Sequence, residues 1–379
     1  MGQDWAGRMK RLFLLLGVAV VAAYMAFVGG LYIGLHPFGQ DALDRVGWPV
    51  KAAKRAIFGI DPVLVTYKSI SPAEAVFSFD PVPGFDGMTL TSPDLISVLP
   101  KNVSPAAGAS SLSDLMLHAR TRTLTGKLSS HSSAMTSHGY FRHIFDFEWT
   151  RPEFFSSESE IADCVTIIVP GTGYDEAAKI IERVGYHEKL IDQLPCQKLV
   201  YVKPNHDSRQ IVYGGRRAEF DYIYSSMVAI GSSYSYWYLQ ELIETVMYLT
   251  SHGKRVILAG LSQGGGASLM VGAVTDADLT VAISGYFDAS KGMLSNSHQI
   301  LIDGMLPFMT PAALSKEFHN RKVIMTYGEH DLPVYQHEAA TGESCKAFAA
   351  LVKNFQCVTH PGGHTYPQNL RAIVERALN

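Results

Sequence analysis

From about residue 161 onward, the chain alternates short apolar runs with longer stretches of helical periodicity. The apolar runs are rich in β-branched residues, which is typical of buried strands, and they lie at residues 164–169, 199–203, 256–259, 279–284, 322–327 and 355–359. Residues 175–194 indicate one or two helices, and apolar residues recur at helical spacing from Leu239 to Val246 in a stretch that ends near Gly253. Parallel strands joined by crossover helices form a doubly wound sheet, so we predict a mostly parallel α/β domain over residues 161–379.

Two stretches do not follow this alternation. Residues 36–160 contain frequent Pro, Ser and Gly between residues 61 and 113, and short apolar runs such as 63–65 fit either edge strands or a stalk. Residues 286–320 interrupt the alternation inside the predicted domain. A cap over a pocket and ordinary surface packing are the two interpretations of that second stretch.

A different pattern lies near the N-terminus, where residues 12–35 carry no charged side chain. At about 1.5 Å per residue, a helix of this length crosses a hydrocarbon core about 30 Å thick. The run is longer than the apolar region of a signal peptide and no small-x-small cleavage site follows it, so we predict an uncleaved transmembrane anchor. Basic residues precede this anchor, and by the positive-inside bias we expect residues 1–11 in the cytoplasm. The α/β domain is then expected outside the cytoplasm, in a periplasmic, extracellular or lumenal space.

The apolar run at 256–259 leads into Gly260-Leu261-Ser262-Gln263-Gly264, and small residues that suit a closely packed helix follow. A G-x-S-x-G sequence between a strand and a helix is the pattern of a nucleophile elbow, which exposes its serine at the edge of a sheet. The turn is strained, and glycines flank the serine because a Cβ there would collide with the neighbouring strand or helix. We therefore predict that Ser262 is a nucleophile, the alternative being a chance match in a chain with 33 glycines.

A serine hydroxyl needs a base to take its proton and an acid to orient that base. Asp331 follows the apolar run at 322–327 and His364 follows the run at 355–359, so both are expected at the carboxyl edge of the sheet. The chain order Ser, Asp, His is the order that elbow-type hydrolases use. Glu329 lies in the same loop as Asp331 and is its rival for the acid position.

These motifs resemble those of the α/β-hydrolase superfamily, and in particular its carboxylesterase, phospholipase and acyl-thioesterase branch. The resemblance extends over residues 161–379 and is carried by residues 260–265, 328–334 and 362–364. It implies a serine hydrolase acting on esters, with Ser262 as the nucleophile, His364 as the general base and Asp331 as the orienting acid. It implies no particular substrate.

The oxyanion that forms during acyl transfer needs two backbone N–H donors held in place beforehand. The amide of Gln263, directly after the nucleophile, is the expected first donor. The second is expected in the loop after residues 164–169, where Thr172 is the preferred donor and Gly173 the next. Pro170 stands where the superfamily usually has the histidine of a His-Gly pair, and a plain glycine turn is the alternative interpretation of this loop.

Composition narrows the range of functions. A net charge of −3 on 379 residues gives no indication of nucleic-acid binding, and no paired-cysteine zinc pattern, phosphate loop or dinucleotide fingerprint is present. His131, His138 and His143 have neither the spacing nor the companion ligands of a metal site. We therefore expect no metal or cofactor, and a small-molecule, lipid or glycan ester as substrate. Acyl transfer to another hydroxyl, and a catalytically silent hydrolase fold used for binding, are the alternatives to hydrolysis.

The four cysteines form two candidate pairs. Cys164 opens one predicted strand and Cys196 precedes the next, and consecutive parallel strands often start side by side at the same edge. Cys345 lies in the helix after the Asp331 loop, and Cys357 lies in the strand that leads to the histidine. In an oxidising compartment we predict the bridges 164–196 and 345–357, whereas four reduced, buried thiols in a cytoplasm are the alternative.

Two further groups have a structural and a functional interpretation. Residues 205–207, Asn-His-Asp, follow a predicted strand and either line a pocket or form a turn. An aromatic run either lines a sugar or acyl site or packs within a helix, with packing preferred, and consists of Tyr234, Tyr236, Trp237 and Tyr238.

Overall fold

The computed structural model describes residues 109–116, 127–133, 140–172, 176–183, 189–209, 211–213, 216–217, 220–229, 232–285, 306–318, 320–329 and 338–379. The predicted cytoplasmic segment 1–11, the predicted anchor 12–35 and much of the segment 36–160 lie outside these residues. Gly173 and Asp331 also lie outside them.

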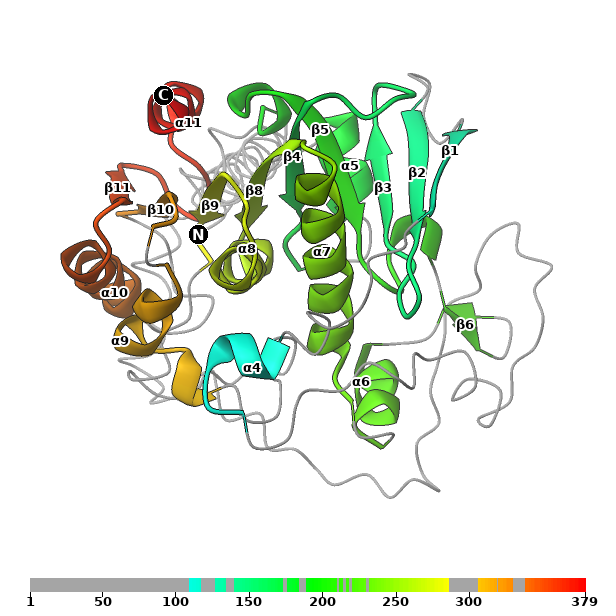
Figure 1. The fold of residues 1–379 in the computed structure, drawn as a ribbon, viewed down its shortest axis with the longest axis horizontal. Coiled ribbons are helices and arrows are strands. Elements are labelled where there is room, and N and C mark those ends of the chain that lie inside the picture. The colour runs from blue at the N-terminus through cyan, green and yellow to red at the C-terminus, as the bar shows by residue number, and fades with distance from the viewer. Residues whose placement is uncertain are drawn as a thin grey trace, which may run out of the picture.

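Nine strands in this part of the chain form one sheet in the order β1-β2-β3-β5-β4-β8-β9-β10-β11 (Figure 1). Their bounds are β1 Lys127–Ser133, β2 Tyr140–Asp146, β3 Glu153–Ser156, β4 Cys164–Val169, β5 Gln197–Val202, β8 Arg255–Leu261, β9 Leu279–Ile283, β10 Val323–Gly328 and β11 Phe355–His360. The strands from β5 to β11 are parallel, whereas β1, β2 and β3 are antiparallel to their neighbours. This confirms the mostly parallel α/β sheet, and the six parallel strands coincide with the six apolar runs of the sequence.

Strands β1, β2 and β3 come from the segment 36–160, in which no strand was assigned from the sequence. They continue the same sheet, and Phe154 of β3 packs on Tyr201 of β5 with 5.4 Å between the ring centroids. Phe145 of β2 packs in turn on Phe154 at 5.6 Å. These three strands are therefore neither a stalk nor separate from the domain, and the sheet begins before the predicted boundary at residue 161.

Helices cover both faces of the sheet (Figure 1). Their bounds are α4 Leu112–Met116, α5 Glu176–Glu182, α6 Phe220–Ala229, α7 Tyr234–Ser251, α8 Gln263–Val274, α9 Pro311–Leu314, α10 Glu338–Leu351 and α11 Leu370–Leu378. Short elements complete the description, namely 3-10 turns η3 Ile191–Gln193, η4 Asp207–Arg209, η7 Leu306–Phe308 and η8 Ser315–Phe318 and a two-stranded ribbon of β6 Val212–Tyr213 with β7 Arg216–Arg217.

The two faces have separate apolar cores. Along β4, Val165 and Ile167 belong to the core that contains α4, α7, α8 and α10, whereas Ile168 belongs to the core that contains α5 and α11. Successive side chains of a strand point to opposite faces, so a strand covered on both sides must be apolar throughout. This is why the parallel strands are continuous apolar runs in the sequence.

The predicted helices are present with shifted ends. Elements α5 and η3 lie within residues 175–194, and α7 ends at Ser251, shortly before Gly253 with its φ of 73° and the start of β8 at Arg255. Of the interrupting stretch 286–320, residues 286–305 lie outside the described chain. Leu314 and Phe318 from its second half are buried in the core shared with α8, so this half packs on the domain.

Both predicted disulfides are present. Cys164 and Cys196 are bonded with their Cα atoms 5.3 Å apart, at the paired starts of β4 and β5. Cys345 and Cys357 are bonded with their Cα atoms 5.7 Å apart, and they join α10 to β11. The second bridge therefore ties a covering helix to the strand that precedes His364.

Among the described residues, no helix has both the length and the apolar character needed to cross a membrane. Residues 12–35 are not among them, so the anchor remains a prediction from the sequence.

Removing each of the two disulfides should lower the free energy of unfolding by a different amount. They close loops with sequence separations of 32 and 12 residues. In the chain-entropy model, replacing both cysteines of a pair by serine should lower the free energy of unfolding by about 4 kcal/mol for the 164–196 pair and about 3 kcal/mol for the 345–357 pair. Denaturant unfolding of the two double variants and the wild type checks this, and four free thiols in the non-reduced wild type would contradict it.

Candidate active site

Ser262 occupies the turn between β8 and α8, and its backbone is strained. Its φ of 58° and ψ of −125° lie outside the regions that residues with a Cβ usually adopt. The Ser262 N–H donates to the Ile283 carbonyl at 2.8 Å, and the Ser262 carbonyl accepts from the N–H groups of Gly265 and Gly266 at 2.8 and 3.3 Å. Main-chain hydrogen bonds on both sides therefore hold the turn in the geometry of a nucleophile elbow.

Three glycines allow main-chain segments to touch around this turn. A Cβ on Gly260 would lie 2.0 Å from the Gly264 oxygen, and a Cβ on Gly264 would lie 2.0 Å from the Val169 oxygen. A Cβ on Gly285, just after β9, would lie 1.8 Å from the Ser262 oxygen. Because these contacts are to backbone atoms that cannot move aside, a side chain is excluded at all three positions.

His364 lies half-buried in the loop after β11. Ser284, at the end of β9, donates its hydroxyl to the Thr365 carbonyl at 3.1 Å. The preceding residue, Ile283, accepts the hydrogen bond from the Ser262 N–H. The end of β9 therefore contacts both the elbow and the histidine loop, so both lie at the carboxyl edge of the sheet.

The histidine loop is also held from within and from β10. The Gly362 N–H donates to His360 Nδ1 at 3.2 Å, and the Thr365 N–H donates to the Gly363 carbonyl at 2.8 Å. A Cβ on Gly328, the last residue of β10, would lie 2.2 Å from the Gly363 oxygen. The loop expected to carry the acid therefore starts in direct contact with the loop that contains His364.

Glu329, the rival for the acid position, is the first residue after β10. Its N–H donates to the His360 carbonyl at 2.8 Å, while its side chain is exposed. Within the described residues, the Glu329 carboxylate makes no hydrogen bond or ion pair. Asp331 lies outside the described residues, so its role as the acid stays a prediction.

The two segments expected to form the oxyanion hole pack directly on each other. Gln263 is buried as the first residue of α8, and Thr172 is exposed in the loop after β4. Gly264 makes the contact between the segments, since its missing Cβ leaves room for the Val169 oxygen. The donor roles of Gln263, Thr172 and the undescribed Gly173 remain predictions.

Lys203 is a residue of this region that sequence reasoning missed. Its ammonium donates to the Gly171 carbonyl at 2.7 Å and to Gln263 Oε1 at 2.6 Å. Burial lowers the pKa of Lys203 to about 7, and the Glu176 carboxylate acts in the opposite direction. The signal in the sequence was a lysine at the carboxyl end of an apolar strand, directly before Pro204.

The arrangement of strands and loops decides the fold. The elbow follows β8 in the middle of a mostly parallel sheet, and the acid and histidine loops follow β10 and β11 at the same edge. This is the chain order of the nucleophile, acid and base loops on the sheet of an elbow-type hydrolase. The chain has the α/β-hydrolase fold.

Comparisons with known proteins give structural similarities at low sequence identity. No model of a protein family and no curated protein matches the sequence. Acetyl xylan esterase 1 from Thermoanaerobacterium sp. JW/SL YS485 is 13% identical with a TM-score of 0.48, over 77% of this chain and 98% of that chain. An acetyl xylan esterase from Paenibacillus sp. R4 is 12% identical with a TM-score of 0.44, over 76% and 99% of the two chains. A carbohydrate esterase family 15 glucuronoyl esterase from Caldicellulosiruptor kristjansonii is 12% identical with a TM-score of 0.39, over 67% and 77%. At these identities and TM-scores, the likeness carries no conclusion about this chain.

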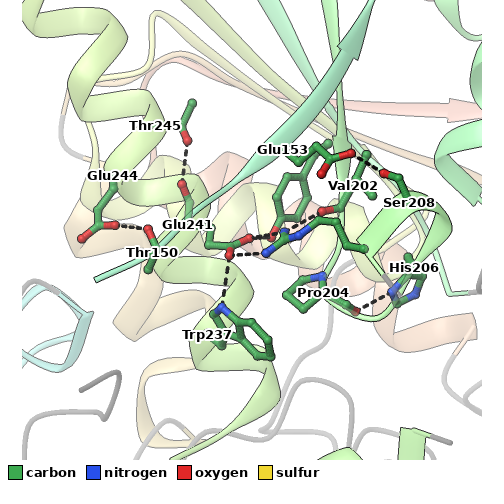
Figure 2. Close-up of polar contacts among 12 residues, drawn as sticks. Thr150, Glu153, Val202, Pro204, His206, Ser208, Trp237, Glu241, Glu244 and Thr245 are labelled. Carbon is green, nitrogen blue, oxygen red and sulfur yellow. Dashed lines mark hydrogen bonds and ion pairs between the residues drawn. The ribbon is translucent and has the colours of Figure 1, made fainter. Parts of the chain in front are cut away.

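A buried polar network holds the loop after β5 against α7 (Figure 2). Arg209 donates from Nη1 and Nη2 to the two carboxylate oxygens of Glu241 at 2.6 and 2.7 Å. Trp237 Nε1 donates to the same carboxylate at 3.1 Å, and the Tyr201 hydroxyl donates to it as well. A bidentate pair with further donors is well satisfied although it is buried, so it fixes the loop that begins at Lys203.

Residues 205–207 form a turn, which was one of their two interpretations. Asn205 and Asp207 have φ values of 62° and 43°, a region that Asn and Asp tolerate better than most residues. Asn205 Oδ1 accepts from the Ile211 N–H at 2.9 Å, and Asp207 Oδ1 accepts from the Ala178 N–H at 3.2 Å. The aromatic run of α7 is buried in the core, which confirms packing as its role.

No group of three or more His, Cys, Asp or Glu side chains suited to a metal ion occurs in the described part of the hydrolase fold.

Proposed function

We propose that this protein is a serine hydrolase that cleaves a carboxylic ester through Ser262, His364 and Asp331. The observation that carries the proposal is the strained φ of 58° at Ser262, held by main-chain hydrogen bonds at the carboxyl edge of the sheet. Strain of this kind persists only where the surrounding structure enforces it, and it is found at functional sites. The contact of the histidine loop with the end of β9 supports the same proposal.

The chemistry proceeds in two halves. The Ser262 hydroxyl attacks the ester carbonyl while His364 takes its proton, and the resulting oxyanion accepts hydrogen bonds from the amides of Gln263 and Thr172. The intermediate collapses, and the alcohol leaves with the proton from His364. Water then attacks the acyl enzyme by the same route, and the acid is released. Asp331 holds the imidazole in the tautomer that both halves need.

We further propose that residues 12–35 anchor the protein in a membrane, with the catalytic domain on the side away from the cytoplasm. The absence of charge over this run and the basic residues before it support the anchor and its orientation. The two disulfides support an oxidising compartment, since structural disulfides are rare in a reducing cytoplasm.

Replacing the nucleophile should abolish catalysis. In Ser262→Ala, hydrolysis of a short-chain ester should fall by a factor of about 10⁴ or more, and a fluorophosphonate probe should no longer label the protein. Ser268→Ala is the matched control, since Ser268 lies on α8, which directly follows Ser262, is fully buried and has no described hydrogen-bond partner for its hydroxyl. The control should hydrolyse the ester and be labelled like the wild type. Equal labelling of Ser262→Ala and the wild type would contradict the proposal.

Two substitutions that each replace a carboxylate by an uncharged amide decide which residue is the acid of the triad. Asp331→Asn should lower kcat by about 10⁴-fold because the imidazole loses its orienting carboxylate, whereas Glu329→Gln should leave kcat close to that of the wild type. Steady-state kinetics on both variants check this. The reverse outcome, with loss in Glu329→Gln alone, would move the acid to Glu329.

The orientation of the protein in the membrane can be tested separately from its catalysis. A reporter fused after Asn379 should be active only outside the cytoplasm, and removal of residues 1–39 should give a soluble protein that keeps its esterase activity, because the triad lies beyond the anchor. A reporter that is active in the cytoplasm would contradict the topology without touching the proposed chemistry.

A further inference from the structure

Lys203 joins the two segments that frame the expected oxyanion hole. It follows β5 directly, and its side chain is 1% exposed. One hydrogen bond from its ammonium, 2.7 Å long, ends on Gly171 in the loop after β4. The other, 2.6 Å long, ends on Gln263 at the start of α8. A single side chain therefore links both segments.

The bond to Gly171 has a consequence for the next residue. The Gly171 carbonyl and the Thr172 N–H belong to one planar peptide group, and in a trans peptide they point in opposite directions. An ammonium fixed on the carbonyl therefore fixes the direction of the N–H as well. Hydrogen bonding to the carbonyl also polarises the peptide, which makes the N–H a stronger donor.

The bond to Gln263 acts on the other donor. It holds the side chain of Gln263, and the backbone N–H of Gln263 is the first one after the nucleophile. The main chain of Gln263 is already confined by the close approach of Gly264 to Val169. Because its side chain and the adjacent main chain are both held, Gln263 has little freedom to turn its backbone N–H away from the reacting carbonyl.

The hydrogen-bond partners of the buried Lys203 ammonium are neutral, while the Glu176 carboxylate of α5 acts on its charge. Within the described residues its hydrogen bonds go to a carbonyl and an amide, no carboxylate forms an ion pair with it, and its ammonium lies 5.5 Å from the centroid of the Tyr238 ring. A buried cation without an ion-pair partner is costly. Negative charge that develops on the substrate oxygen adds an opposite charge in the transition state, and this added attraction favours the transition state over the ground state.

We propose that Lys203 is a positioning residue of the oxyanion hole, which aligns the amides of Thr172 and Gln263 and places a positive charge behind them. The inference deepens the proposed function and rests on it.

The test uses the full-length protein and the rate at which a fluorophosphonate labels Ser262, which needs no knowledge of the natural substrate. In this reaction the Ser262 oxygen bonds to phosphorus, fluoride leaves, and His364 takes the serine proton. Lys203→Met keeps the apolar stem and removes the charge and the donors. Labelling and kcat on a short-chain ester should both fall by about 10²-fold with KM nearly unchanged, as for the loss of one oxyanion-hole donor.

Lys198→Met is the matched control, because Lys198 lies on the same β5 strand and touches neither of the two segments by a described hydrogen bond. It should label like the wild type. Equal labelling of Lys203→Met and Lys198→Met would overturn the inference. Failure of the wild type to be labelled at Ser262 would instead overturn the proposed function, so the two failures are distinguishable.

The pH profile separates a positioning role from a purely structural one. The groups that act on the ammonium are Glu176 of α5, the Tyr238 ring of α7 and the Gln263 amide of α8. Since the pKa of Lys203 is lowered to about 7, its charge is present below that pH and lost above it. The labelling rate of the wild type should therefore decline on the alkaline side, and Lys203→Met should lack this decline.

A second variant covers the case in which Lys203→Met does not fold. Gln263→Glu places a carboxylate in contact with the ammonium, which should raise the pKa of Lys203 and move the alkaline decline to higher pH. A decline that stays at the wild-type pH in Gln263→Glu would overturn the inference.

Discussion

Contact between backbone segments around Ser262 is the constraint on which the rest of the site depends. Gly264 admits the Val169 oxygen of β4, and Gly285 admits the Ser262 oxygen itself, at separations that no Cβ permits. The hydrogen bond from the Ser262 N–H to the Ile283 carbonyl also holds the turn against the end of β9. The relative positions of β4, β9 and α8 are therefore set by main-chain atoms, which adjust far less than side chains do.

From this fixed turn, the other parts of the site are placed by short polar links. Ser284 connects the end of β9 to the histidine loop, and Lys203 connects the loop after β4 to Gln263. The Arg209–Glu241 pair in turn holds the loop that begins at Lys203 against α7. A site built this way has its donors and charges oriented before the substrate arrives, which is the condition under which electrostatic stabilisation of a transition state is effective.

Much of this arrangement could be predicted because it depends on local pattern. Strands buried on both faces are apolar runs, the glycines around Ser262 are required by close contact, and the Cys164–Cys196 pair follows from the order of neighbouring strands. Strands β1 and β2 were missed because they are partly polar, as in the sequence KLSSHSS of β1, and β3 was missed because it has only four residues. Lys203 was missed for a different reason: its partners, Gly171 and Gln263, lie in distant parts of the chain, and no pattern near residue 203 reveals them.

The central claim is that the strained serine of this fold becomes acylated during turnover. Peptide mapping by mass spectrometry, on enzyme quenched with acid while it hydrolyses an activated acetate ester, tests the claim most directly. The account predicts one acetyl group per chain, located on Ser262, with a burst of released alcohol of the same amount. Continued turnover with no acetyl group on Ser262 at any time, or with the acetyl group on another residue, would contradict it.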